Sequence, residues 1–346
     1  MTRTWWRLTL LWLVGNDLRL TLLAVPPVLP LIHTELHLDE KGIAALSGLP
    51  VLLLGLAAVP GSLLIARIGP RRALLCGLCL IGLSSALRAI GPSIPVLFSM
   101  TVLMGAGIAI SQPTLPALVR HWFDTPSAIA RATGVWSNGL LVGELLSASL
   151  TLPLILPLVG SWENSFAFWS VPVLLTAVLV ALGTPHVARA AGVARPSGMP
   201  DWRSSRMWRL GLLQSSASMV YFGANTFIPD YLHVTNQADL VGVALASLNG
   251  AQVPASAVIG LVPLRILARR STSLGVAAAI LLSLVVVLTL PGAPLVIAAG
   301  VFGFCAAYIL VLSFALPALL AAPSEVARLS AGTFAISYTT AFLVTL

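Results

Sequence analysis

Eleven long apolar segments, separated by short polar stretches, constrain this chain more than any other feature. A helix crosses the hydrocarbon core of a bilayer with roughly 20 predominantly apolar residues, and backbone groups in lipid must find their hydrogen bonds within the protein. The segments suit such helices and are too long for barrel strands. They predict an all-α polytopic membrane protein of about eleven helices, at 6–33, 43–66, 72–90, 94–119, 128–156, 163–184, 207–232, 241–264, 273–290, 294–320 and 329–346.

Composition supports this class and excludes a soluble one. The chain is 58% hydrophobic and 9% charged, with a mean hydropathy of +0.98, whereas soluble domains average about 25% charged residues. The first segment is too long for a secretory signal peptide and lacks a small-residue cleavage site. Cys76 and Cys79 have the spacing of a redox pair, but inside an apolar helix we expect them to be small packing residues.

Basic residues gather at one set of segment ends. The opposite set carries Lys41, Arg88 and six acidic residues. By the positive-inside rule, the arginine-rich ends and the amino terminus are cytoplasmic, which predicts a multi-pass protein of a bacterial-type cytoplasmic (inner) membrane. The net charge of +8 therefore reflects topology and not a nucleic-acid partner. The arginine-rich ends comprise Arg3, Arg7, Arg67, Arg71, Arg72, Arg120, Arg131, Arg189, Arg195, Arg203, Arg206, Arg209, Arg265, Arg269, Arg270 and Arg328.

The chain contains a weak internal repeat. The motif RxxxRR begins at Arg67 after the second segment and again at Arg265 after the eighth, 198 residues later. A polar stretch at 186–206 separates six segments from five. These features predict two parallel-repeated halves, 1–185 and 207–346, joined by a cytoplasmic loop at 186–206. Transporters built in this way rock their halves about a site near the midplane of the membrane.

A plan of six plus six helices needs a twelfth helix, which this sequence lacks. The chain stops at Leu346, at an apolar run without a polar tail. We expect a truncated chain. A genuine eleven-helix protein with an extracytoplasmic carboxyl terminus is the alternative.

Several stretches carry a recognisable pattern: DLR (17–19) followed by PPVLP (26–30), then LPVLLLGLAAVPGSLL (49–64), GAGIAISQPTLPALVRHWF (105–123), TGVWSNGLLVG (133–143) and RLSAGTFAISY (328–338). They resemble the major facilitator superfamily and, within it, the cyanate (CynX-type) and nitroimidazole transporter family. The resemblance implies that segments one, four, seven and ten line a central cavity and that segment five packs beside segment one. The chain departs from the family pattern at Asp17, where the family has Asn, and at Ala66, where the superfamily usually has Asp.

Three charged residues, Asp17, Arg19 and Glu144, lie deep within the apolar segments. A charge at a helix centre costs about 2.5–3.5 kcal/mol even on lenient insertion scales, so each should face protein or water and have a partner. Asp17 and Arg19 stand roughly 200° apart around a helix and cannot pair with each other. Glu144 lies at a similar depth to Arg19 and is its natural partner.

We expect Arg19 to line the cavity and bind a small anionic or polar solute, because a guanidinium stays charged and offers a planar fork of donors. Glu144 would be its resting partner or a proton carrier, with Asp17 a second candidate for coupling. The structural alternative is that Arg19 and Glu144 lock two helices together, while Asp17 caps irregular backbone. The prolines at 26–30 are expected to bend the first helix, although ordinary helix termination fits Pro30 equally well.

Other segments place polar residues at helical spacing. Such residues either bind the solute or make hydrogen bonds between helices, worth about 0.6 kcal/mol on average. Asn138, Asn249, Gln252 and Tyr308 are secondary candidates for the site. The primary candidates, besides Arg19, are Gln112, Trp136, Gln214, Tyr221 and Asn225.

No Walker sequence, metal-ligand cluster or nucleophile–base motif is present, so we expect no enzyme activity, cofactor or metal site. Without an ATP site, the gradient of the solute or of an ion such as the proton must supply the free energy. The leading interpretation is a monomeric secondary active transporter that moves a small cyanate-like anion or polar solute by alternating access. Efflux of nitroimidazoles or other small drug-like molecules is the alternative within transport; a channel or a membrane enzyme is the rival class.

Overall fold

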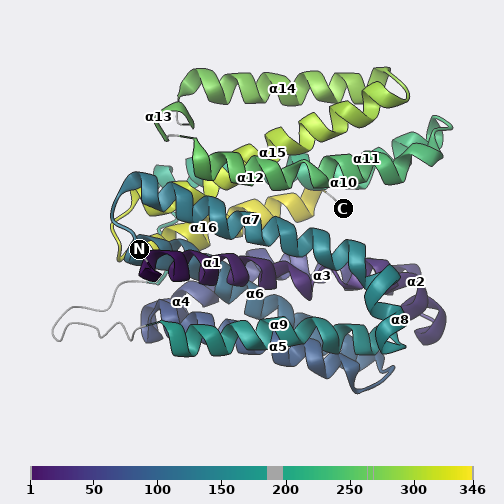
Figure 1. Ribbon diagram of the computed structural model, residues 1–346, viewed down its shortest axis with the longest axis horizontal. Helices are drawn as coiled ribbons and strands as arrows, with labels where there is room; N and C mark the ends of the chain where they lie inside the picture. Colours follow the sequence, from purple (N-terminus) through teal and green to yellow (C-terminus); the bar gives the residue numbers. More distant parts are fainter. Residues whose placement is uncertain (1, 185–197, 263, 268, 345–346) are drawn as a thin grey trace.

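The computed structural model describes residues 2–184, 198–262, 264–267 and 269–344. Within these ranges the chain is helical and contains no strand, and the long helices run side by side as one bundle (Figure 1). The predicted all-α membrane fold is confirmed. The predicted division into 1–185, 186–206 and 207–346 stays a prediction, and residues 186–197 of its proposed loop lie outside the described residues.

The first six predicted segments form nine α-helices with two irregular turns of helix. A 3₁₀-helix, η1, continues α5, and a π-helix, η2, follows α7. The elements are α1 (Thr2–Leu20), α2 (Val25–Leu36), α3 (Glu40–Leu56), α4 (Ala58–Ile68), α5 (Pro70–Leu87), η1 (Arg88–Ile90), α6 (Ile94–Trp122), α7 (Pro126–Leu150), η2 (Thr151–Ile155), α8 (Leu156–Val159) and α9 (Trp162–Gly183).

The remaining segments form α10 (Ser205–Val234), η3 (Ala238–Leu240), α11 (Val241–Gly250), α12 (Gln252–Leu261), α13 (Leu264–Leu267), α14 (Arg270–Thr289), α15 (Ala293–Leu320) and α16 (Val326–Val344). Among the described residues, eight helical stretches are long and apolar enough to span a membrane. The pair α3–α4, bent by 48°, raises that number to nine if it forms one span. Helices α10 and α16 match the predicted seventh and eleventh segments, but their more polar composition keeps them outside this count.

The helix packing repeats between the two parts of the chain. Helix α1 packs on α7 as α10 packs on α16, and α5 packs on α6 as α14 packs on α15. Contacts between the parts are also reciprocal, because α7 packs on α12 while α16 packs on α3 and α4. In Figure 1, α11, α12, α14 and α15 lie on one side of the bundle and α4, α5, α6 and α9 on the other. This arrangement has the reciprocity that a tandem repeat requires.

The first predicted segment is broken into two helices. Helix α1 ends at Leu20, residues 21–24 form a turn, and α2 starts at Val25 with prolines in its first turn. The first turn of a helix tolerates proline, since its N–H groups have no partner within the helix. Pro30 lies inside α2. The expected interruption is therefore present, and it falls directly after Arg19.

Three glycines allow α1 and α7 to touch. A Cβ atom added at Gly15 would lie 2.0 Å from the carbonyl oxygen of Trp136, and one added at Gly143 would lie 2.3 Å from that of Asn16. Gly139 approaches α1 in the same way, because its Cβ would lie 2.1 Å from the oxygen of Trp12. Small residues at such a crossing let two backbones pack closely. This crossing fixes the distance between Arg19 on α1 and Glu144 on α7.

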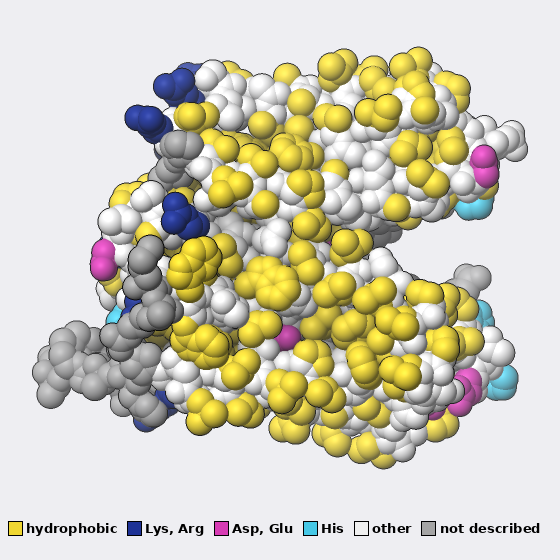
Figure 2. All heavy atoms as spheres, in the orientation of Figure 1, with side chains coloured by type: hydrophobic (Ala, Val, Ile, Leu, Met, Phe, Trp, Pro, Cys, Tyr) yellow, Lys and Arg dark blue, Asp and Glu magenta, His cyan; other side chains and the backbone are white. Residues whose placement is uncertain are grey.

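The two ends of the bundle differ in charge and in shape. Lysine and arginine side chains gather at the end where α1 begins and α13 lies, whereas most acidic and histidine side chains lie at the opposite end (Figures 1 and 2). At that opposite end a deep notch separates the region of α2 and α8 from the region of α11. At the arginine-rich end, α4 meets α16 and α7 meets α12 and α13. The bundle is therefore open at one end and closed at the other.

We predict that Gly143→Ala destabilises the protein by about 1–3 kcal/mol, because the added methyl group meets backbone that must shift. Gly275→Ala is the matched control, since nothing lies within 4 Å of a Cβ added there. That control should be neutral or slightly stabilising, as alanine favours helix more than glycine does. Thermal unfolding of both variants in detergent, followed by circular dichroism, provides the measurement. Equal unfolding temperatures would show that the α1–α7 crossing tolerates a wider spacing.

Candidate functional site

Arg19 lies in the last turn of α1 and is buried, with 7% of its surface exposed. The carbonyl groups at the end of a helix carry partial negative charge, which stabilises a cation in the last turn. Its Nε atom lies 3.9 Å from Oε2 of Glu144, and its Nη2 atom donates a hydrogen bond of 3.4 Å to the hydroxyl of Tyr338. Arg19, just before the break in the first segment, therefore contacts one carboxylate and one hydroxyl.

Glu144 extends from the α7 helix and is partly accessible, its side chain being 19% exposed. Its Oε1 atom accepts a hydrogen bond from the hydroxyl of Tyr221 on α10. Its other oxygen, Oε2, faces Arg19. Two ion pairs are recorded between described residues, and the second, between Arg328 and Glu325, lies at the surface. Arg19–Glu144 is the one enclosed in the bundle.

Tyr338 on α16 connects three helices. Its hydroxyl oxygen accepts the hydrogen bond from Arg19 on α1 and a second one, of 2.6 Å, from the side-chain amide of Gln112 on α6. Its ring stacks on that of Phe334, with centroids 6.1 Å apart. These contacts hold the hydroxyl beside the guanidinium.

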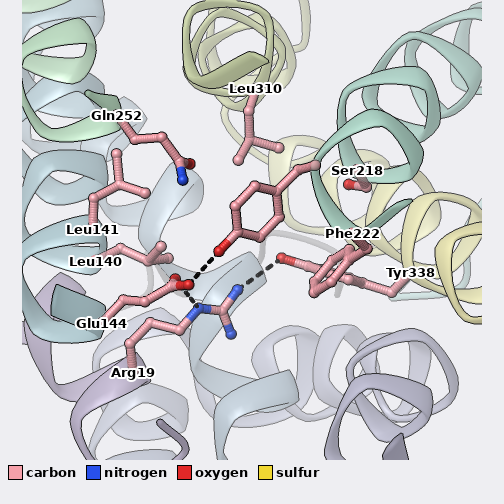
Figure 3. Close-up of a pocket in the computed structure, with 10 residues that line it drawn as sticks. Arg19, Leu140, Leu141, Glu144, Ser218, Phe222, Gln252, Leu310 and Tyr338 are labelled. Carbon is pink, nitrogen blue, oxygen red and sulfur yellow. Dashed lines mark hydrogen bonds and ion pairs between the residues drawn. The ribbon is translucent and has the colours of Figure 1, made fainter. Parts of the chain in front are cut away.

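These groups surround a small, partly open cavity. In Figure 3, Arg19 and Glu144 lie together on one side and Tyr338 lies on the other, while the amide of Gln252 points toward the same space. Pockets with a few converging polar groups on mainly apolar walls are typical of small-molecule sites. The lining residues are Arg19, Leu140, Leu141, Glu144, Ser218, Tyr221, Phe222, Gln252, Leu310 and Tyr338.

A chain of amides continues from Tyr221 away from the ion pair. The Oδ1 atom of Asn249 lies 3.0 Å from the Tyr221 hydroxyl and accepts a 3.0 Å hydrogen bond from Gln252. The amide of Asn249 in turn donates to Oδ1 of Asn225 at 2.9 Å. The chain thus gives the polar side of the cavity a rigid support on α10, α11 and α12.

Residues 11–345 match the family model described as Major Facilitator Superfamily. The chain belongs to the major facilitator superfamily. This match covers nearly the whole sequence and explains the reciprocal packing of its two parts.

Curated relatives within the superfamily are distant. The chain is 27% identical over 242 residues to the cyanate transport protein CynX of Escherichia coli, covering 69% of this chain and 62% of that protein. It is 27% identical over 230 residues to the 2-nitroimidazole transporter of the same organism, covering 64% and 56%. An uncharacterized transporter of Bacillus subtilis, YycB, is 24% identical over 230 residues, covering 66% and 56%. The chain therefore matches less than two thirds of the length of these relatives.

Solved structures support the same fold. The human organic anion transporter MFSD10 superposes with a TM-score of 0.77 at 16% identity, over 98% of this chain and 91% of that one. FucP in the outward conformation superposes with a TM-score of 0.70 at 15% identity, over 97% and 89%. At these identities the comparison concerns the fold alone. The predicted major facilitator fold and the recognition of the cyanate and nitroimidazole relatives are confirmed.

The structure brings part of the predicted site together. Arg19, Glu144 and Tyr221 meet at the cavity. Gln112 reaches it through the hydroxyl of Tyr338, and Asn225 belongs to the amide chain.

Three predicted site residues lie elsewhere. Trp136 is buried, and its ring stacks on Phe314 at 5.1 Å. Gln214 is buried without a partner among the described residues for its Nε2 atom. Asp17 is buried near Thr176 of α9, and its Oδ2 atom has no hydrogen-bond partner among the described residues. None of the three lines the cavity.

Arg88, which the sequence analysis placed at the segment ends opposite the arginine-rich ones, is a further buried arginine. The side chain is 1% exposed, lies 4.2 Å from the ring centroid of Phe166, and donates to the carbonyl of Thr21 at 2.9 Å. It lies in η1, the last turn of the predicted segment 72–90. Although an arginine near a segment end normally extends to water, this one packs within the bundle.

Tyr338 is the main residue that the sequence analysis missed. It lies in α16, 194 residues after Glu144. The 198-residue offset of the repeated arginine motif carries position 144 to 342, one helical turn from Tyr338, so the repeat indicates this part of α16 and not the tyrosine itself.

We predict that breaking the Arg19–Glu144 pair destabilises the protein more than removing it. Arg19→Gln and Glu144→Gln should each cost roughly 2–3 kcal/mol, below the 3–5 kcal/mol typical of fully buried pairs because Glu144 is partly accessible. The double variant should cost less than the sum of the single ones. A thermal-unfolding cycle measures this, with Arg328→Gln and Glu325→Gln as the surface pair expected to couple by about 0–1 kcal/mol. Additive losses at positions 19 and 144 would contradict the pairing.

Proposed function

We propose that this protein is a secondary active transporter that moves a small anion by alternating access, with Arg19 as the anion-binding residue. The observation that carries the proposal is the position of the guanidinium in the cavity wall, opposed by a single carboxylate 3.9 Å away. A cation kept in an apolar bundle marks a substrate or ion pathway. Distant relatives that transport cyanate and 2-nitroimidazole support a small solute.

Charge balance adds a role for Glu144. Arg19 and Glu144 together leave the cavity neutral, so an arriving anion adds an uncompensated charge and is repelled by the carboxylate. A proton on Glu144 removes both penalties. The site then carries one anion and one proton without net charge, which supports proton-coupled transport with one proton per monovalent anion.

The proposed mechanism also includes a division of the chain into two halves and an orientation of the protein in the membrane. The halves 1–185 and 207–346 rock about the cavity, and the loop at 186–206 joins them. The arginine-rich end with the amino terminus lies in the cytoplasm of a bacterial cell. The notch of Figure 2 then opens to the extracytoplasmic side, and the protein binds its solute from there as a monomer.

A second candidate substrate is a neutral or weakly charged heteroaromatic molecule such as a nitroimidazole, exported from the cell. The apolar walls of the cavity favour it, because Leu140, Leu141, Phe222 and Leu310 offer a surface for a flat ring. The polar side would then bind the nitro group. Competition by cyanate, nitrate and thiocyanate against transport distinguishes the two, because such anions compete directly only for a site built around a cation.

We predict that Arg19→Gln lowers the rate of uptake of labelled cyanate into proteoliposomes about 100-fold or more. Arg19→Lys should retain a few per cent, because lysine keeps the charge but not the planar fork of donors. Arg328→Gln, which removes a surface arginine, is the control and should transport normally. Unchanged uptake by purified, folded Arg19→Gln would refute the proposed function.

Glu144→Gln should separate exchange from accumulation. With the carboxylate replaced by a neutral amide, anion exchange across the membrane continues, but an imposed pH gradient no longer drives accumulation. Counterflow and pH-jump uptake in the same proteoliposomes give the two rates, with Glu325→Gln as the control. Accumulation driven by a pH gradient in Glu144→Gln would exclude this carboxylate as the proton carrier.

A further inference from the structure

The four polar residues around the cavity lie on helices that pack in matching pairs. Arg19 on α1 faces Glu144 on α7, and α1 packs on α7 as α10, which carries Tyr221, packs on α16, which carries Tyr338. The 198-residue offset of the arginine motif carries positions 19 and 144 to 217 and 342, each four residues, about one helical turn, from a tyrosine. The first pair of helices thus meets the cavity with an ion pair and the second with two tyrosines.

Each charged residue on the first pair of helices bonds to a tyrosine on the second pair. The bonds cross over, because the residue on α1 meets the tyrosine on α16 and the residue on α7 meets the tyrosine on α10. Arg19 donates to Tyr338, and Glu144 accepts from Tyr221 (Figure 3). Together with the ion pair, these contacts form a row from Tyr338 through Arg19 and Glu144 to Tyr221, which joins α1 and α7 to α10 and α16. A ligand in the cavity beside this row touches both parts of the protein.

The hydroxyl of Tyr338 has a donor to offer such a ligand. A tyrosine hydroxyl has one hydrogen and two lone pairs. Its oxygen accepts from Arg19 at 3.4 Å and from Gln112 at 2.6 Å, which occupies the lone pairs. Among the described residues no acceptor is recorded for its own hydrogen, and the side chain lines the cavity. Tyr221 differs, because its hydrogen is given to Glu144.

We infer that Tyr338 is a substrate-binding residue, and that the transported anion binds between its hydroxyl and the guanidinium of Arg19. This inference rests on the proposed function and adds a contact from the opposite part of the chain. When the anion arrives, Arg19 exchanges its weak contacts with Glu144 and Tyr338 for the anion, and the hydroxyl hydrogen of Tyr338 donates to the same anion. Tyr221 continues to hold Glu144 after the ion pair opens, as a positioning residue.

The four tyrosines of the chain provide a matched experiment. Tyr338→Phe removes one hydroxyl and keeps the ring that stacks on Phe334. Tyr231→Phe and Tyr308→Phe remove hydroxyls that donate to the backbone carbonyls of Leu288 and Leu267, away from the cavity. Cyanate is the probe, with binding measured by isothermal titration calorimetry and transport measured in proteoliposomes at a fixed pH gradient.

We expect Tyr338→Phe to raise the KM and Kd for cyanate about tenfold or more, as for a lost hydrogen bond to a charged group. Its maximal rate should stay within about twofold of the original, and both control variants should match the unmodified protein. A lower maximal rate with unchanged KM would show a merely structural hydroxyl and overturn the inference. Normal KM in Tyr338→Phe, together with inactive Arg19→Gln, would overturn the inference and leave the proposed function standing.

Two further results complete the test. If Arg19→Gln transports cyanate normally, the proposed function fails and this inference fails with it. If Tyr338→Phe does not yield folded protein, the near-ultraviolet difference spectrum of the unmodified protein replaces it. Saturating cyanate should then produce a tyrosine difference signal that is absent in Arg19→Gln, and a spectrum without that signal would overturn the inference.

Discussion

The contact between Arg19 and Glu144 is the interaction on which the rest of this structure depends. A guanidinium alone in an apolar bundle is costly, and here the carboxylate at 3.9 Å, the carbonyl groups at the end of α1 and the hydroxyl of Tyr338 share its charge. This requires α1 to end directly after Arg19. It also requires α1 to pack against α7 at Gly15, Gly139 and Gly143, where an added Cβ atom would meet the backbone of the other helix. The loose distance leaves the guanidinium able to change partners.

The fold could be predicted from the sequence because its determinants are local. The length and apolarity of each segment specify a membrane helix, and the prolines at 26–30 coincide with the break after α1. The contacts of the site are not local: Arg19 and Tyr338 are 319 residues apart in sequence. The hydrophobic pattern does not determine which face of a helix meets which neighbour. Asp17, two residues from Arg19, accordingly lies near Thr176 and does not line the cavity.

The contacts that join the two parts of the bundle at its closed end involve small residues, unlike the charged and hydroxyl groups around the cavity. A Cβ added at Gly134 on α7 would lie 3.0 Å from the Cα of Gly260 on α12, and Asn138 donates to Ser256 across the same contact. The reciprocal contact places Gly55 of α3 against Thr339 of α16, at 2.7 Å for an added Cβ. Small residues permit these crossings without large interlocking side chains, so the backbones of the two parts approach closely there.

Tyrosines in the second part of the chain, in place of a second ion pair, suit the proposed site, which binds an anion and a proton together and so keeps its net charge. Another arginine and carboxylate would add two more groups to desolvate, and each would compete with Arg19 and Glu144 for partners. Hydroxyls join the two parts by hydrogen bonds without adding charge, so the empty site remains neutral. Under the proposed mechanism the site also remains neutral with one anion and one proton bound. The protein can then change the side to which the site opens in either neutral state, whereas an anion bound without a proton would leave a net charge inside the bundle.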